Sequence, residues 1–177
     1  ENFNNYFGAT DGAAAPTPAD ADRWKRYGIK LKPSERKWER FDPRLDLTAT
    51  PKEVNRFGYV VELNPWDPTS TPVKHTALGR FKHEAATIYV TGDGTVVAYS
   101  GDDERFDYIY KFVAAKKMQP GRDAAAMAAN MALLDEGTLY VAKLSSDIPP
   151  SQIDGSGTLP ATGSFGGRES SCSGFSP

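Results

Sequence analysis

Two short charged segments hold the side chains best suited to chemistry. The first, residues 79–86, brings Arg80, Lys82, His83 and Glu84 together at the start of an apolar run. A carboxylate at such a strand start can point into a central channel, and calcium prefers carboxylate oxygens while iron accepts them readily. The alternative is an ordinary turn between strands whose charges are solvated by water.

The second segment, residues 101–107, carries four carboxylates within a few positions. Its spacing does not match an EF-hand loop, which needs alternating acidic residues, a central glycine and a late glutamate. The segment therefore either binds a cation or is a soluble turn. A mixed outcome is that Arg105 pairs with one carboxylate while another, such as Asp102 or Asp103, faces the site.

The remaining candidates for chemistry are weaker. His75 lies in an alternating run and is expected to be structural or exposed. Ser70 and Ser100 have no His and Asp arranged around them, so a serine nucleophile has little support. Neither of the glycine-rich phosphate-binding patterns occurs in the sequence.

Alternating apolar and polar residues predict a chain rich in β-strands. The expected strands are residues 57–63, 73–78, 86–91, 95–100, 108–113 and 137–144. The Gly-Asp-Gly sequence at 92–94 predicts a tight hairpin turn, because glycine adopts the positive φ that such turns need. The Ala- and Met-rich residues 122–134 predict one short helix.

The other segments show less regular patterns. Residues 1–8 are expected to end a strand and enter a loop, and the proline-rich residues 13–52 form a long loop. We therefore expect an all-β chain, part of a β-propeller of about one and a half to two blades, with long loops and one short helix. Residues 1–144 would form this propeller fragment. Residues 145–177, rich in Gly, Ser and Pro, would be a poorly ordered tail or a loop.

Composition excludes several classes of protein. The 177 residues carry a formal net charge of −2, and the basic residues are dispersed, so nothing indicates nucleic-acid binding. No apolar run is long enough to span a membrane. The single cysteine, Cys172, excludes an internal disulfide framework, and its role stays open. The chain starts at Glu1 without an initiator Met, so we expect a removed start or an internal fragment.

Several segments, in this order, resemble the PhoX alkaline phosphatase family. They are ENFN (1–4), NRFGYVVE (55–62), STPVK (70–74), ALGRFKHEAA (77–86), VAYSGDDER (97–105), YIYKFV (108–113) and LDEGTLYVA (134–142). The resemblance implies a six-bladed propeller exported to the periplasm or outside the cell. It also implies hydrolysis of phosphate esters at calcium and iron ions held largely by carboxylates.

Carried over by position, the resemblance makes Glu84 the first metal ligand and Glu1 the second, with Asp102 and Asp103 as further candidates. The family's cysteine ligand of iron is not transferred to Cys172, which lies outside any family motif. The remaining ligands would come from the other propeller blades or from partner chains, so the isolated chain is expected to have little or no activity. Two alternatives stay open: a structural or interaction segment, and a propeller that binds phosphate esters without catalysis.

Overall fold

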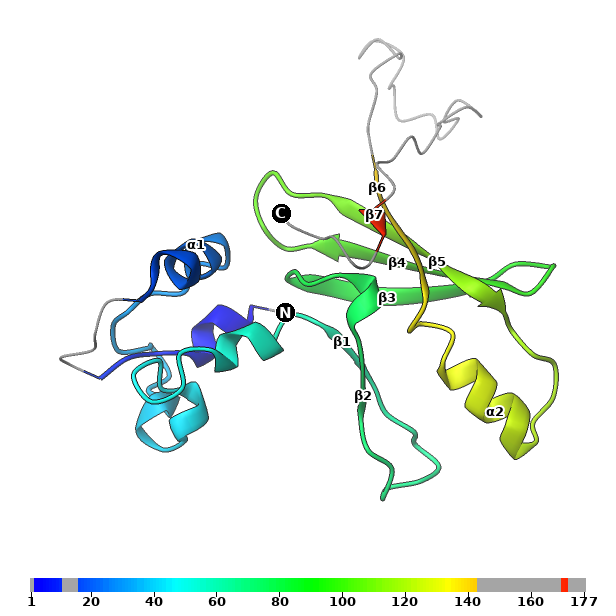
Figure 1. Cartoon of the computed structure of the whole chain (residues 1–177), viewed down its shortest axis with the longest axis horizontal. Coiled ribbons are helices and arrows are strands. Elements are labelled where there is room, and N and C mark those ends of the chain that lie inside the picture. Colours follow the sequence, from blue (N-terminus) through cyan, green and yellow to red (C-terminus); the bar gives the residue numbers. More distant parts are fainter. Residues whose placement is uncertain (1, 11–15, 143–169, 172–177) are drawn as a thin grey trace, which may run out of the picture.

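The computed structural model describes residues 2–10, 16–142 and 170–171 of the chain. Its strands form two antiparallel sheets, and two short α-helices flank them (Figure 1). Among the described residues, no helix is long and apolar enough to cross a lipid bilayer.

The larger sheet has five strands that are adjacent in the same order as in the sequence. They are β3 (His83–Val90), β4 (Thr95–Asp102), β5 (Ile109–Lys117), β6 (Gly137–Val141) and β7 (Ser170–Ser171). The β3–β4 hairpin closes at Gly94, whose φ of +85° is the positive value expected for a glycine turn. The Asp93 carboxylate accepts hydrogen bonds from Thr91 and Thr95, which fixes the turn.

One face of this sheet builds the first hydrophobic core. Val96, Ala98, Tyr110, Phe112 and Leu139 project from β4, β5 and β6 on that face and are buried. The 3-10 helix η5 (Thr76–Leu78) and the segment after α2 (Ala124–Met131) supply the side chains that pack against them. The alternation of the strands thus produces a half-buried sheet.

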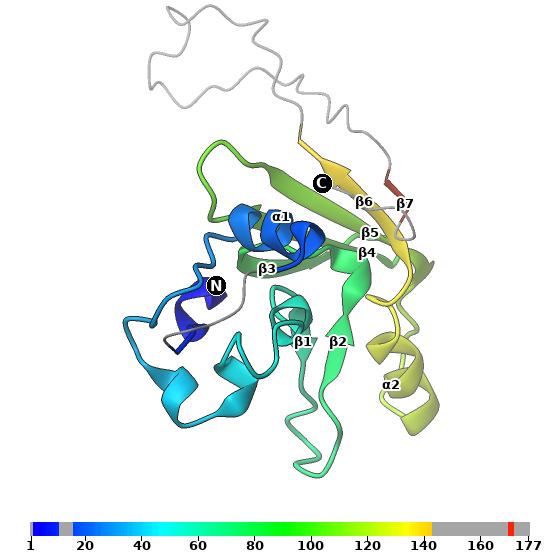
Figure 2. The ribbon, with the colours of Figure 1, turned by 60° about the vertical axis from the view of Figure 1, so that its left-hand side comes forward.

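The second core lies in the N-terminal part, where short helices and loops replace strands. Helix α1 (Pro18–Arg26) and three-residue or four-residue 3-10 helices surround it (Figure 2). These are η1 (Phe3–Tyr6), η2 (Trp38–Arg40), η3 (Pro43–Leu45) and η4 (Glu53–Arg56). Phe3, Trp24, Tyr27 and Val54 are buried there. Large aromatic side chains supply much of the buried surface of this core, which, within the described residues, has no sheet or long helix to pack against.

Arg80 directly precedes Phe81 of the first core and contacts residues of the second core. Its Nε and Nη2 donate to the carbonyl oxygens of Phe57 and Val54 at 2.9 and 2.8 Å. Its guanidinium lies 4.2 Å from the ring centre of Tyr27, and the Tyr27 hydroxyl donates to the Arg80 carbonyl at 2.9 Å. Burial lowers the pKa of Arg80, while the neighbouring tyrosine Tyr27 opposes that effect. The charge is therefore held by carbonyl dipoles and aromatic faces.

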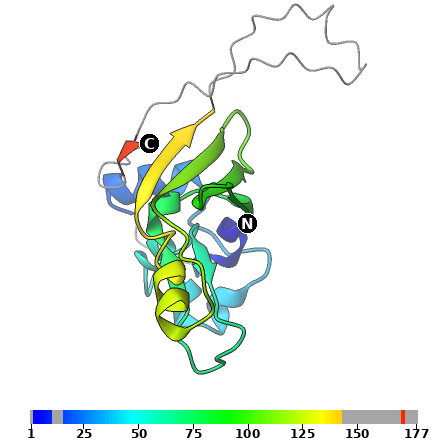
Figure 3. The same cartoon turned by 90° about the vertical axis from the view of Figure 1, so that its right-hand side faces the viewer.

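His75 makes a second junction, at the end of the small sheet of β1 (Val60–Glu62) and β2 (Val73–His75). Its ring is fully buried, with Nε2 2.7 Å from Glu62 and Nδ1 2.8 Å from Asp135. Asp135 follows α2, which lies beside the β1–β2 ribbon (Figure 3). This contact agrees with the structural role expected for His75.

Most sequence-based expectations of secondary structure are confirmed, with shifted ends. All six expected strands exist, and the helix predicted over 122–134 is α2. The strand expected over 73–78 stops at His75, because Thr76–Leu78 turns into η5. The strand end expected in residues 1–8 is wrong, since Phe3–Tyr6 is a 3-10 helix.

The expectation of one short helix is also wrong, because α1 interrupts the proposed long loop. Thr17 caps it by accepting a hydrogen bond from the Asp20 backbone, and Pro18 occupies its first turn. Thr-Pro followed by an acidic residue is a helix-start signal in the sequence. The tail expectation for 145–177 lies outside the described residues, apart from Ser170 and Ser171 in β7.

We predict that Arg80→Met lowers the free energy of unfolding by about 2–4 kcal/mol, because two carbonyl oxygens lose their donor. Arg80→Lys should fall between wild type and Arg80→Met, since an ammonium cannot donate as a planar fork. Urea unfolding followed by fluorescence, to which the buried Trp24 contributes, measures the change. Arg122→Met at an exposed position serves as the control, and equal stability of both variants would contradict the prediction.

Candidate carboxylate site

The acidic segment forms the connection between β4 and β5, and Arg26 of α1 contacts it. Asp102 is the last residue of β4, and its side chain is only 2% exposed. The Arg26 guanidinium of α1 lies 3.6 Å from Asp102 Oδ2 and 3.7 Å from Asp107 Oδ2. One cation thus stands between two carboxylates that would otherwise repel each other.

Burial raises the pKa of Asp102, and the charge of Asp107 raises it further, while Arg26 opposes both effects. Asp102 Oδ1 is buried and has no hydrogen-bond partner among the described residues. Burial and the nearby Asp102 charge also raise the pKa of Tyr110 to about 12. Asp102 Oδ1 is therefore a buried acceptor without a hydrogen-bond donor among the described residues, while Arg26 lies 3.6 Å from the other oxygen, Oδ2.

Lys82 provides the second cation of the loop. Its side chain is buried, and Nζ lies 2.6 Å from Glu104 Oε2. This hydrogen bond lowers the pKa of Glu104. The expectation that Arg105 pairs with a carboxylate is wrong: Arg26 and Lys82 make the ion pairs of this loop within the described part of the chain.

Asp103 is exposed and meets the start of the chain. Asn2 Nδ2 donates to Asp103 Oδ2 at 2.8 Å, and the Asp103 backbone N–H donates to the Lys82 carbonyl at 3.0 Å. Glu1, the second proposed ligand, lies outside the described residues. The structure therefore brings its neighbour Asn2, far away in sequence, to the acidic loop.

Glu84 lies in β3, at the same end of the β3–β4 pair. It pairs with Gly101, whereas His83 pairs with Asp102. Directly paired residues of an antiparallel ladder share a face, and successive residues alternate. Glu84 and Asp102 are consequently close together in the β3–β4 ribbon, but their side chains leave the backbone on opposite faces of it.

A serine–histidine contact that sequence reasoning missed lies beside this point. His83 Nδ1 is 2.9 Å from Ser100 Oγ, and its ring stacks on Phe81. Burial lowers the pKa of His83 to about 4, so the ring is neutral near pH 7. The Ser100 hydroxyl donates to the carbonyl of Ala85, whose φ is +62°. The pair thus stabilises a strained bulge, and the hydroxyl proton is directed away from the histidine.

The donor set only partly suits a metal ion. Carboxylate oxygens fit calcium, and the partnerless Asp102 Oδ1 is a suitable ligand atom. However, residues 2–10, 16–142 and 170–171 contain no group of three or more His, Cys, Asp or Glu side chains that could hold an ion. The described residues alone therefore do not complete a metal site.

The described part of the chain is rich in β-structure, with a meandering sheet whose β4–β5 connection carries the cluster of carboxylates. A family model described as alkaline phosphatase PhoX matches residues 1–166, so the chain belongs to the PhoX alkaline phosphatase family. This finding confirms the resemblance seen in the sequence.

A solved structure of PhoX from Pseudomonas fluorescens, in complex with vanadate, a transition state analogue, is similar to this chain. The sequences are 48% identical over 82% of this chain, with a TM-score of 0.68. The match covers 24% of the Pseudomonas chain, so this protein corresponds to about a quarter of that length. No curated protein matches the chain.

We predict that Glu104→Gln lowers the free energy of unfolding at pH 7 by about 1–2 kcal/mol, because Lys82 loses its counter-ion. The loss is smaller than for a fully buried pair, since Glu104 is partly exposed. The pKa of Glu104 is lowered in the folded state, so the pair stabilises the fold above the ordinary value of 4.5. The difference from wild type should shrink as the pH falls through the lowered pKa.

Urea unfolding at pH 7 and at acidic pH values measures this difference. Glu136→Gln is the matched control, because its exposed carboxylate lies 3.7 Å from the exposed Lys116 and should change stability by less than about 0.5 kcal/mol. A Glu104→Gln effect that stays constant with pH would refute the ion pair as its cause.

Proposed function

We propose that this chain is part of a secreted, metal-dependent phosphatase that hydrolyses phosphate esters. The observation that carries the proposal is family membership over residues 1–166. The 48% identity to a phosphatase structure that holds a transition-state analogue supports it. The chain would form about one and a half to two blades of a β-propeller, consistent with the meander of β3 to β7.

We further propose that Glu84, Glu1, Asp102 and Asp103 supply carboxylates to calcium and iron. Bound metal ions would neutralise phosphoryl charge and activate or orient an oxygen nucleophile. The buried, partnerless Oδ1 of Asp102 supports its role, because a cation would satisfy that atom. Asp103 and Glu84 belong to the same end of the β3–β4 ribbon.

The cations of this chain have a positioning role in the proposed site. Arg26 holds Asp102 and Asp107, and Lys82 holds Glu104. Without them, the carboxylates of one short loop would repel each other and separate. The loop is thereby organised before any metal ion binds, which reduces the cost of ordering it.

Further ligands would come from the remaining propeller blades or from partner chains. This follows from the incomplete donor set in the described residues. We also propose a periplasmic or extracellular location, as the family implies. In isolation, the 177-residue chain should show no phosphatase activity.

One observation favours a second candidate, a structural or interaction segment. In the described sheet β3 has β4 on one side only, and it exposes Ile88, Tyr89 and Val90. An exposed apolar edge strand is a template for pairing with another chain. A segment of this kind could also serve a propeller that binds phosphate esters without catalysis.

We predict that Glu84→Gln lowers kcat at least about 10- to 100-fold, because a lost ligand weakens metal binding. The test uses a chain of the Pseudomonas protein's length that contains these residues, supplied with calcium and iron and a chromogenic phosphate monoester. Metal content is measured on the same samples, and Glu136→Gln should behave as wild type.

Full activity and full metal content in Glu84→Gln would remove Glu84 from the ligand set. A metal-loaded wild-type chain of that length without activity would refute the enzyme and favour the binding alternative.

A further inference from the structure

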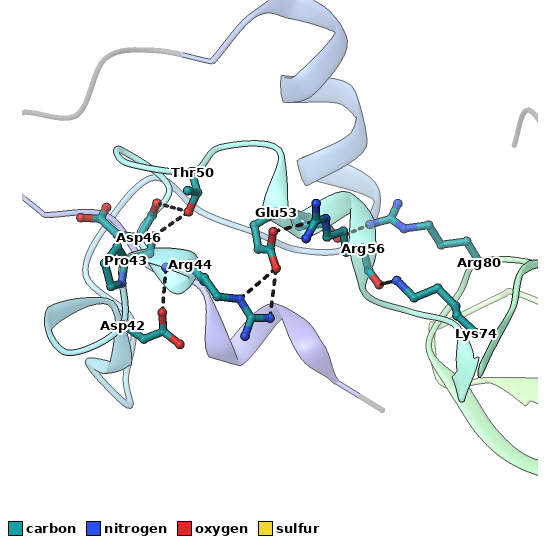
Figure 4. Close-up of polar contacts among 10 residues, drawn as sticks. Asp42, Pro43, Arg44, Asp46, Thr50, Glu53, Arg56, Lys74 and Arg80 are labelled. Carbon is teal, nitrogen blue, oxygen red and sulfur yellow. Dashed lines mark hydrogen bonds and ion pairs between the residues drawn. The ribbon is translucent and has the colours of Figure 1, made fainter. Parts of the chain in front are cut away.

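A cavity of about 390 Å³ lies apart from the acidic loop, between η3, η4 and the β1–β2 ribbon. Its lining includes Arg44, Glu53, Arg56, Tyr59, Val61 and Lys74. Three of these side chains are cations, and they come from three different elements (Figure 4). With the single carboxylate, the formal charge of the lining is +2.

Glu53 organises the two guanidinium groups. Its side chain is 9% exposed, and its Oε1 accepts from Arg44 Nε and Nη2, each at 3.1 Å. Its Oε2 lies 3.5 Å from Arg56 Nε. Arg44 and Arg56 are 63% and 73% exposed, so their N–H groups that do not contact Glu53 are accessible to a ligand. The Glu53 carboxylate thus holds the guanidinium groups of Arg44 and Arg56 and leaves some of their N–H donors available.

Lys74 completes the cationic group from the other side. Its Nζ donates to the carbonyl of Arg56 at 2.6 Å and lies 5.2 Å from the ring centre of Tyr59. An ammonium group has three donors, so two remain after this bond. Its position is therefore set by the Arg56 carbonyl and by the Tyr59 ring, and none of the described carboxylates forms an ion pair with it.

The nearby carboxylates Asp42 and Asp46 are engaged in their own turns. Asp42 Oδ1 accepts from the Arg44 backbone at 2.9 Å, and Asp46 Oδ1 accepts from the Thr48 backbone at 2.8 Å. These contacts account for one oxygen of each group. Neither residue lines the cavity, so the lining itself keeps its formal charge of +2 for a ligand or for solvent ions.

We propose that this cavity is a binding site for a phosphoryl anion, either inorganic phosphate or a phosphate monoester. A phosphoryl group presents three terminal oxygens and a charge near −2, which matches both the net charge and the three separate cations. A monocarboxylate would leave one charge uncompensated. Tyr59 and Val61 add aromatic and aliphatic surface, which suits the organic group of an ester.

The test is direct binding to the 177-residue chain at low ionic strength. Inorganic phosphate and phenyl phosphate are each titrated and followed by amide chemical shifts. Arg56→Gln and Lys74→Gln should each weaken binding about three- to ten-fold, as expected for losing one charge-assisted bond at an exposed site. Lys116→Gln, at an exposed position on β5, should leave the affinity unchanged.

Dispersed amide spectra show that each variant is folded. Arg56 lies in η4 and Lys74 in β2, so if one variant fails to fold, the other still tests the proposal. Tighter binding of phenyl phosphate would identify an ester as the ligand, and equal affinities would identify the phosphoryl group alone. No saturable binding, or binding that both variants leave within two-fold of wild type, would overturn the proposal. Because turnover is not measured, the result is independent of the proposed phosphatase activity.

Discussion

The half-buried guanidinium of Arg80 makes the contacts on which the arrangement of this chain depends. It contacts the carbonyls of Val54 in η4 and of Phe57 just after it, as well as the ring of Tyr27, and thereby fixes the helical part to the sheet. Tyr27 directly follows Arg26, whose side chain reaches Asp102 and Asp107. The Arg80 contacts therefore also determine where α1 places its cation over the acidic loop.

In the acidic loop, repulsion between neighbouring carboxylates is offset by their ion pairs with Arg26 and Lys82. Two carboxylates at close range cannot both be charged without cost, and burial increases that cost for Asp102. Arg26 approaches at 3.6 and 3.7 Å, which is longer than the Lys82–Glu104 contact of 2.6 Å. Arg26 approaches Oδ2 of Asp102, whereas Oδ1 of the same carboxylate is buried without a hydrogen-bond partner among the described residues.

The sequence predicted the elements better than the contacts between them. Alternation located β5 because that strand buries one face, the Gly-Asp-Gly turn placed β3 and β4 on either side of it, and Ala-rich composition located α2. Helix α1 was missed, although Thr17 and Pro18 carry a start signal, because prolines nearby favoured a loop. The partner of Asp102 could not be read from the sequence: Arg105 is near in the chain, but tertiary packing brings Arg26 instead.

The proposed ligands show why a motif does not by itself define a site. Glu84 follows His83 directly, yet the ladder directs them to opposite faces, and His83 shares its face with Asp102. The bulge at Ala85, stabilised by Ser100, changes the register immediately after Glu84. A local change of strand twist is a common way to re-aim a side chain beside an active site. Ala85, with its strained φ of +62°, follows Glu84 at the point where the register shifts, so a local bulge separates Glu84 from the regular part of the β3–β4 ladder.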